Sequence, residues 1–553
     1  MRCQNAKFGF DYDRTHIADF EFGNFRGTYA FSNPTDFALG QYAFFSQSSG
    51  TPYFNFTVPY YGFYGQDKIQ VSSKLTLNLG LREDFQVFPQ PQENPAFPLT
   101  GQFPNQYKRW APRLGFAYSP KSNTVVRGGF GVFYEILDGI NYENSVVSNG
   151  LSSQQSSAFT VFNKGLAPNA QAPQVIAPGF GNGPTFPSII TRPAFFAGSS
   201  NLSLIDPGFQ TPAILESSLE IEQQFSPSTT LTVGTMWTHA YHLIASSAYD
   251  LNLIPPTGTT TYVACPPGAV AAPCTGPSTT GPNLDSGLLA NREGLISSKF
   301  GQINALISPG EDTYNSFYVK LERRMSKGLE SLISYTYSKD LCTDGTDFYN
   351  QFNLSNLNSP CLLDQRNRLS IAGVYTAHFG GSSAAGQKLL NNWMISTEMA
   401  FNSGRPYASL LNTAPSGNML NDSAFNQTTS NTALGINGSG ISPTIGLNSL
   451  YGPGIDEIDF SVSRIFHVRE NQTITLMAEA FNLFNTSNFY VQNGAGINQV
   501  QYNPMGANCG DGATQNQTCY LVPNSGPGGY GTLESIGQLN GPRIFQFSLT
   551  YQF

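Results

Sequence analysis

Cysteine spacing gives the clearest chemical signal in this sequence of 553 residues. Cys3 stands alone, and the other six cysteines form three pairs that are close in sequence: Cys265 with Cys274, Cys342 with Cys361, and Cys509 with Cys519. Local pairs of this kind predict disulfide-closed loops in an oxidising compartment. A metal site is disfavoured, because the sequence contains no C-x-x-C and no histidine lies at ligand spacing from any pair.

No set of residues predicts a catalytic or cofactor site. The five histidines are scattered, and we interpret His239 and His242, which share a strand end, as polar residues at a membrane interface. The G-F-G-N-G at 179–183 lacks the strand-to-helix context of a phosphate loop and is interpreted as a flexible loop. Asp11 and Asp13 are interpreted as solvated charges in a periplasmic turn. We therefore expect neither an enzyme nor a bound cofactor or metal.

Aromatic residues interleaved with amides suggest a ligand-contact position in one long loop. The stretch D-F-Y-N-Q-F-N contains Phe348, Tyr349, Asn350 and Phe352, which suit stacking on, and hydrogen bonding to, a neutral polar ligand. This interpretation rests on composition, and an ordinary solvated loop has the same composition.

Charged residues of both signs recur at alternate positions of several segments, so in extended strands they would share one face. Isolated charges are costly to bury, so we expect these residues to pair with one another or with a separate part of the protein enclosed by the strands. They are Arg82, Arg127, Glu216, Glu220, Glu222, Lys320, Glu322, Arg324 and Glu479.

The elements that must position these groups are extended strands. The chain ends I-F-Q-F-S-L-T-Y-Q-F, so Phe545, Phe547, Leu549, Tyr551 and Phe553 alternate with polar residues. Successive side chains of a strand point to opposite faces, so this segment predicts a strand between lipid and water. About 15 segments give a strand signal of this kind: 7–12, 20–31, 56–70, 74–82, 110–119, 124–135, 215–224, 229–240, 316–324, 330–339, 368–379, 393–402, 458–466, 473–482 and 544–553.

The lengths of the connections alternate along the chain. Those at one end of the strands are about 3 to 11 residues long and those at the other about 24 to 75, as in barrels with short periplasmic turns and long extracellular loops. A soluble β-sandwich does not sort its loops in this way. The expected fold class is therefore all-β, a transmembrane antiparallel β-barrel in the outer membrane of a Gram-negative-type bacterium.

Composition excludes other classes. The net charge of −8 and the absence of a basic cluster disfavour a nucleic-acid partner. No apolar run reaches the roughly 18 residues that a transmembrane helix needs. The first 25 residues contain no signal peptide. With an odd strand count as well, we expect N-terminal sequence to be missing.

Several motifs carry a family resemblance. A-E-A-F-N-L-F-N-T-S-N-F at 478–489 resembles the penultimate-strand motif of TonB-dependent outer-membrane receptors. Y-G-F-Y-G-Q-D at 61–67, W-A-P-R-L-G-F-A-Y-S-P at 110–120, T-V-V-R-G-G-F-G-V-F-Y-E at 124–135 and G-R-P-Y at 404–407 resemble the same family, and their order is more specific than any single motif. Within the family, the chain is most similar to the Oar-like branch. On this resemblance, 1–553 is one partial TonB-dependent-receptor-like β-barrel without a plug domain, supplying about 15 of about 22 strands.

The resemblance implies a function and partners. We expect a receptor or transporter barrel for TonB-coupled uptake of a large nutrient, surrounded by outer-membrane lipid and reached by TonB only through the missing plug. Tyr551 and Phe553 would belong to the signal read by the barrel-assembly machinery. The nutrient is unknown. A passive pore, and a surface adhesin or structural barrel that binds through its long loops, remain as alternatives.

Overall fold

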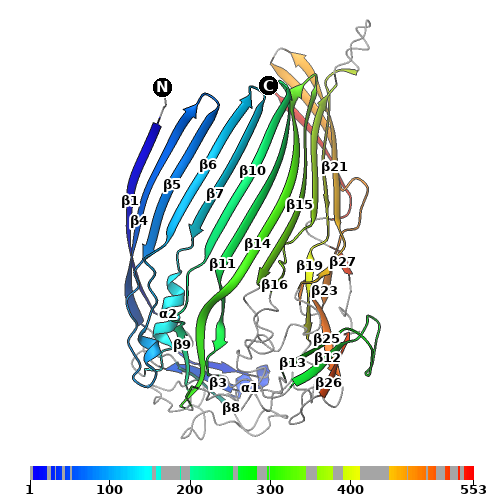
Figure 1. Cartoon of the computed structure of the whole chain (residues 1–553). Coiled ribbons are helices and arrows are strands. Elements are labelled where there is room, and N and C mark those ends of the chain that lie inside the picture. The colour runs from blue at the N-terminus through cyan, green and yellow to red at the C-terminus, as the bar shows by residue number, and fades with distance from the viewer. Residues whose placement is uncertain are drawn as a thin grey trace.

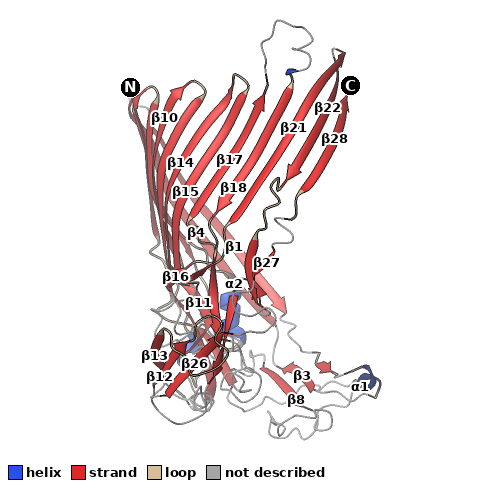
Figure 2. Ribbon diagram, turned by 90° about the vertical axis from the view of Figure 1, so that its right-hand side faces the viewer, coloured by secondary structure: helices blue, strands red, loops and turns tan. Residues whose placement is uncertain are grey.

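The computed structural model describes residues 4–20, 26–31, 33–39, 44–49, 53–151, 157–162, 187, 200–252, 259–282, 296–297, 299–343, 358–377, 390–411, 448–469, 471–493, 496–497, 499–505, 517–523, 533–535 and 541–553. Figures 1 and 2 show one large curved sheet whose strands are joined by short turns at one end. At the other end the strands continue into a body of short elements. We call the sheet the wall.

The wall contains 14 strands in one continuous order, and each is antiparallel to its neighbours. They are β1 (Gln4–Phe20), β4 (Tyr53–Ser72), β5 (Leu75–Gln86), β6 (Trp110–Lys121), β7 (Thr124–Tyr134), β10 (Ala213–Ser226), β11 (Thr229–Asp250), β14 (Phe300–Ser326), β15 (Leu329–Thr343), β17 (Asn367–Thr376), β18 (Trp393–Asn402), β21 (Ile455–Arg469), β22 (Gln472–Phe481) and β28 (Ile544–Gln552). Within the described residues, β1 and β28 at the two ends of this order are not paired with each other.

The two faces of the wall follow from the period of two. Leu79 of β5 lies opposite Leu114 of β6, and Leu77 lies opposite Phe116, so leucines and aromatics of neighbouring strands share one face. This face is exposed along the wall, whereas most of the charged residues face the other way. Such a division fits lipid on the apolar face and a polar lumen on the other, which we call the inner face.

The sequence interpretation is wrong at the N-terminal end of the wall. β1 runs from Gln4 to Phe20 without the turn predicted between the strands 7–12 and 20–31, because each of its residues has a partner in β4, between Ile69 and Tyr53. The only strand described within 20–31 is β2 (Thr28–Ala30), which belongs to a different sheet. The other predicted strands all lie in the wall, which therefore has one strand fewer than predicted.

The body at the far end, which we call the head, consists of the long connections and the adjoining ends of β4, β11 and β14 (Figure 1). Its described elements are β2, α1 (Pro34–Ala38), β3 (Phe44–Ser49), the 3₁₀ helix η1 (Pro98–Gly101), α2 (Gly139–Val147), β8 (Ser157–Phe162), β9 (Ser200–Ile205), β12 (Thr259–Ala264), β13 (Ser278–Pro282), β16 (Asn358–Pro360), β19 (Pro406–Leu411), β20 (Leu450–Tyr451), β23 (Phe489–Asn493), β24 (Gly496–Ile497), β25 (Gln499–Met505), β26 (Gln517–Pro523) and β27 (Leu533–Ser535). None of the described helices is long and apolar enough to cross a membrane.

The head has a hydrophobic core of its own. Phe56 of β4, Phe88 and Phe103 of the connection after β5, and Tyr142 of α2 form one buried aromatic group. The rings of Phe88 and Phe103 lie 4.6 Å apart, and that of Tyr142 lies 4.6 Å from Phe56. Asp138 is the N-cap of α2, and its side chain accepts a hydrogen bond from the backbone N–H of Ile140. The long connections are therefore packed structure around these residues, where the sequence predicted only loops.

Three distant connections also meet in one sheet of the head. Its order is β13-β12-β26-β25-β19-β20, so it joins the connection after β11 to those after β18 and after β22. The central pairing of β12 with β26 is parallel, with Tyr262 opposite Cys519. We call this six-stranded sheet the clasp.

Candidate functional site

The terminal strand β28 lies against β22 as its alternation predicts. Leu549 is opposite Leu476 and Phe547 opposite Ala478. Phe547 is 78% exposed, whereas Ser548 between these apolar residues is half-buried. The predicted alternation of the terminal strand is confirmed, with its apolar side chains on one exposed face. The contact of this face with lipid stays a prediction.

Tyr551 and Phe553 continue the apolar face to the end of the chain. Their rings lie 5.7 Å apart, and Phe553 is 89% exposed. This places two aromatic rings at the end of the strand, where another protein can contact them. Their role as an assembly signal stays a prediction.

An ion-pair cluster on the inner face joins β1, β4 and β5. Arg82 lies 2.9 Å from the carboxylate of Asp11 and 2.6 Å from that of Asp84. It also donates to the hydroxyl of Tyr60, which donates to Asp84. Asp11 is therefore an ion-pair partner within β1, and its interpretation as a solvated turn residue is wrong. Asp13, opposite Tyr60, is also a residue of β1 rather than of a turn.

A second ion-pair cluster joins β7, β10 and β14. Arg127 lies 3.2 Å from Glu220 and 2.7 Å from Glu222, and the hydroxyl of Tyr318 donates to Glu220 at 2.8 Å. The predicted pairing of inner-face charges is confirmed for these residues. The partners Asp84 and Tyr318 were missed, because side chains on different strands meet only once the register is known.

The remaining predicted inner-face charges differ in their contacts. Lys320 and Glu322, two residues apart on β14, form an ion pair at 3.0 Å. Glu216, Arg324 and Glu479 make no ion pair among the described residues.

Aromatic residues mark the end of the lipid face nearest the head. The ring of Trp237 stacks on His239 at 6.0 Å, and His239 stacks on Tyr241 at 6.1 Å. Trp237 is in register with Asn315, which is in register with the exposed Lys339. Aromatic residues beside a lysine are typical of the membrane–water interface, as expected for His239. Asp340 and the residues beyond it therefore lie outside the membrane-spanning part of the wall.

Two of the predicted disulfides are present in the head. Cys265 is bonded to Cys274, with their Cα atoms 5.5 Å apart, and Cys342 is bonded to Cys361, with their Cα atoms 5.3 Å apart. Cys519 is also disulfide-bonded, and its predicted partner Cys509 lies outside the described residues. The cysteine pairs thus cross-link the long connections, as the sequence predicts.

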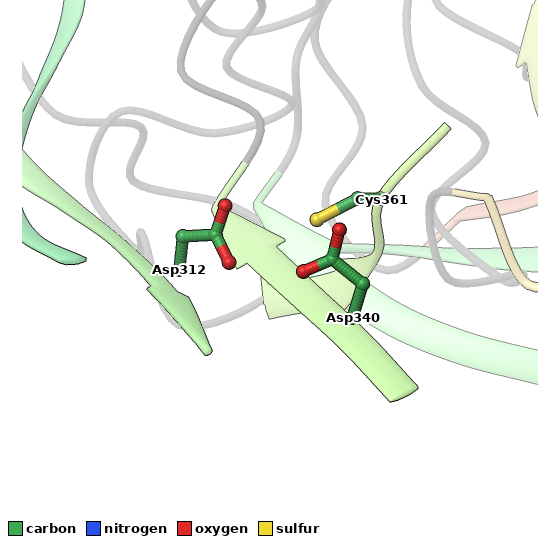
Figure 3. A group of neighbouring side chains, drawn as sticks. All are labelled: Asp312, Asp340 and Cys361. Atoms are coloured by element: carbon green, nitrogen blue, oxygen red, sulfur yellow. The ribbon is translucent and has the colours of Figure 1, made fainter. Parts of the chain in front are cut away.

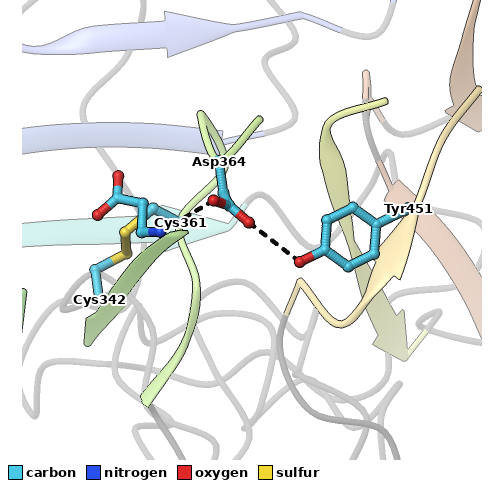
Figure 4. The surroundings of a disulfide bond; sticks show 5 residues. Cys342, Cys361, Asp364 and Tyr451 are labelled. Atoms are coloured by element: carbon cyan, nitrogen blue, oxygen red, sulfur yellow. Dashed lines mark hydrogen bonds between the residues drawn. A yellow bond between two sulfur atoms is a disulfide. The ribbon is translucent and has the colours of Figure 1, made fainter. Parts of the chain in front are cut away.

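The Cys342–Cys361 disulfide adjoins a buried carboxylate, Asp364 (Figure 4). Asp364 is 1% exposed, accepts a hydrogen bond from the backbone N–H of Asp340 at 3.0 Å and forms an ion pair with Arg366 at 3.0 Å. The hydroxyl of Tyr451 in β20 donates to it at 3.1 Å. We call Asp340, Cys361, Asp364, Arg366 and Tyr451 the junction. It ties the connection after β15 to β20 of the clasp.

Two junction residues and Asp312 of β14 form the one group of described residues with metal-ligand geometry (Figure 3). Asp312, Asp340 and Cys361 each place one ligand atom within 4.8 Å of the others. The sulfur of Cys361 is bonded to Cys342 and supplies no thiolate, so two carboxylates remain. Burial, followed by the hydrogen bond and charge of Asp312, raises the pKa of Asp340 to about 7.

The predicted ligand-contact residues are not part of this geometry. Phe348, Tyr349, Asn350 and Phe352 lie outside the described residues, as does the G-F-G-N-G at 179–183. Their assignment stays a prediction.

Comparison with known proteins gives a family match over almost the whole chain. The family described as outer membrane beta barrel domain matches residues 3–546. No curated protein matches the sequence.

Several solved structures are similar to the chain. The outer membrane transporter YddB from Escherichia coli has 11% identity and a TM-score of 0.47, over 90% of this chain and 50% of that one. A mutant of the ferric enterobactin receptor PfeA from Pseudomonas aeruginosa has 11% identity and a TM-score of 0.44, over 100% and 51%. The iron transporter FrpB from Neisseria meningitidis has 10% identity and a TM-score of 0.41, over 88% and 48%. The chain spans about half the length of these proteins.

Proposed function

Because the chain belongs to the outer membrane beta barrel domain family, and its wall therefore lies in the outer membrane, we propose that it is the barrel of a TonB-coupled receptor. Its role is the uptake of a nutrient too large for porins. The nutrient binds at the head, and energy enters through a plug domain of the kind that TonB-dependent receptors carry. The proposed role is binding and passage, without catalysis.

The observation that carries this proposal is the inner face of the wall. Arg82 and Arg127 are each held by two carboxylates there, on the face opposite the exposed leucines and aromatics. A polar lumen wall of this kind suits the passage of a hydrated solute or contact with a polar domain inside the barrel. The head, at the far end of the wall strands, has a packed core and connections cross-linked by disulfides. It supplies a structured surface for recognition.

Uptake in cells tests this function. Cells with the native gene and cells with the gene deleted would be given labelled ferric siderophores, oligosaccharides and peptides above the porin size limit. We expect one class to accumulate only in cells with the gene, and a protonophore that collapses the inner-membrane potential to abolish this uptake. Gene-dependent uptake that survives the protonophore would identify a passive pore. Surface binding without uptake would identify an adhesin.

Deletion of Phe553 tests the proposed assembly signal. We expect less folded protein in the outer membrane and unchanged synthesis, because Phe553 is 89% exposed at the chain end and makes little internal packing. The measurement is heat-modifiable migration of membrane fractions, with Gln552→Ala as the matched control. Full assembly without Phe553 would remove the assignment.

A further inference from the structure

A pocket on the inner face of β1, β4, β5 and β6 gathers three basic side chains. Its volume is about 340 Å³, and its lining includes Lys7, Lys68 and Arg113. In the register of the wall, Lys7 is opposite Gln66, Gln66 is opposite Gly80 and Gly80 is opposite Arg113. Lys7 and Arg113 therefore occupy the two ends of one row across four strands.

Two glycines form the floor of this pocket. Gly80 lies between Gln66 and Arg113, and Gly115 of the next row lies beside Asn78. A Cβ atom at Gly80 would lie 3.7 Å from the Cβ atoms of Arg113 and Gln66, in ordinary van der Waals contact, so a side chain can be added there without a clash. Because Gly80 and Gly115 have no side chains, they leave a hollow, and the longer side chains of the lining stand at its edge.

The basic residues of the pocket differ from Arg82, Arg127 and Lys320 in forming no ion pair with an acidic residue among the described residues. Arg82 and Arg127 are each held by two carboxylates, whereas the ion pairs of the described residues include none of Lys7, Lys68 and Arg113. The guanidinium of Arg113 lies over the ring of Phe133, 4.6 Å from its centre, which fixes its position without neutralising it.

The one carboxylate in the lining belongs to the other face. Asp67 is in register with Ala6 and Leu79 of the lipid-facing set, and its carboxylate accepts a hydrogen bond from Gln4. The inner side of the pocket therefore presents positive charge together with the amides of Asn5, Gln66 and Asn78.

The size of the row limits the ligand. Three strand spacings separate Lys7 from Arg113, which is about 14 Å between their backbones. Lys7 of β1 and Lys68 of β4 lie on neighbouring strands, two residues apart in register, so a ligand with two or more anionic groups can contact both. Arg113 lines the far edge of the pocket, with its guanidinium on the β7 side over Phe133. A single small anion can contact only one end.

We propose that this pocket is a lumenal binding site for a multivalent oxyanion, of the diphosphate or polycarboxylate class. Arg113 provides a forked donor with a fixed orientation, and the two lysines provide mobile charges. The glycine floor admits the ligand close to the backbone. The site is separate from the head and does not depend on the uptake function proposed above.

Calorimetry with pyrophosphate tests the site. The full chain would be folded in zwitterionic detergent and titrated with pyrophosphate at constant ionic strength, with citrate and inorganic phosphate as comparison ligands. We expect pyrophosphate or citrate to bind at least about tenfold more tightly than phosphate. The Lys68→Gln and Arg113→Gln double variant should lose at least about tenfold in affinity, the equivalent of one charge-assisted hydrogen bond.

The matched control removes the same charge elsewhere on the inner face. The double variant Lys320→Gln and Arg324→Gln, on β14, should bind as the unchanged protein does. Equal losses in the two double variants would show general charge attraction only and overturn the site. So would phosphate binding as tightly as pyrophosphate, or the absence of binding to the unchanged protein.

Two glycine-to-leucine variants test whether binding depends on the shape of the pocket, because they leave its charge unchanged. Gly80→Leu fills the floor and should abolish binding, whereas Gly373→Leu in β17, away from the pocket and with the nearest neighbours of a Cβ at 3.8 Å, should leave it unchanged. Heat-modifiable migration would establish that both variants are folded. Unaltered binding by folded Gly80→Leu would overturn the assignment of this pocket.

Discussion

The wall and the head use the same apolar residue types in opposite ways. In the wall, Phe547 and Leu549 are 78% and 69% exposed, because the surrounding solvent is lipid. In the head, Phe56 and Phe88 are 7% and 3% exposed and pack against other rings. Apolar exposure is therefore stabilising in one region and costly in the other, depending on the solvent that each region meets.

Truncation of a head phenylalanine should have the largest effect. Phe88→Ala removes a ring that stacks on Phe103 and approaches Tyr142, and should cost about 3 to 5 kcal/mol of head stability. Phe63→Ala, on the lipid face of β4, should cost much less, because lipid or detergent replaces the lost contacts. Chemical unfolding in detergent, followed by near-ultraviolet circular dichroism, compares the two. Similar losses would contradict the difference drawn between the regions.

A lysine introduced into the wall should destabilise it on the lipid face and have little effect on the inner face. Phe547→Lys should cost about 2 to 4 kcal/mol if it lies near the bilayer midplane, and Ser548→Lys, facing the lumen, much less. Heat-modifiable migration in membrane fractions would measure the folded fraction of each. Equal folding of the two variants would remove the lipid-facing assignment of β28.

Loss of a disulfide should loosen the head and leave the wall unchanged. Replacing Cys265 and Cys274 by serine should destabilise their connection by roughly 2 to 3 kcal/mol, because a short closed loop restricts the unfolded chain. Limited proteolysis would show faster cleavage in the head and the same protected wall. Mass mapping of non-reduced peptides checks the pairing, including Cys509 with Cys519, and free thiols or crossed pairs would contradict it.

A change of pH should have the smallest effect, and again in the head. The pKa of Asp340 is raised to about 7, so its protonated form is favoured on folding. This contribution is complete below the ordinary pKa near 4 and is lost as the pH rises through 7. From pH 5 to pH 8 we expect the junction to lose about 1 kcal/mol after allowance for the solvent exposure of Asp340. Asp340→Asn should remove this dependence in thermal unfolding followed by near-ultraviolet circular dichroism; an unchanged pH profile would contradict it.

The wall could be predicted from the sequence, because its signal is local. Period-two alternation, short turns and the motif at 478–489 indicated the strands and the outer-membrane barrel, and the family match confirms the barrel. The prediction failed at β1, where Asp13 and His16 interrupt the apolar pattern. There, partners in β4 outweigh the local turn signal.

The head could be predicted only through its cysteines. Cys265 and Cys274 are close in sequence, so their pairing could be inferred. The core around Tyr142 and the contact of Asp364 with Tyr451 join segments far apart in the chain, and no local pattern indicates them. The ion-pair clusters of the inner face could be predicted in part. The sequence indicated that their charges pair, but the identity of each partner depends on the register of the strands.

The parallel pairing of β12 with β26 has a consequence for the order of folding. The two strands come from the connection after β11 and the connection before β28, so the clasp needs chain from both halves of the wall. Contacts between such distant segments carry a large loop-closure entropy and form slowly. We therefore expect the clasp to form after the hairpins of the wall. During biogenesis the head would then remain without its clasp until the chain before β28 has been made.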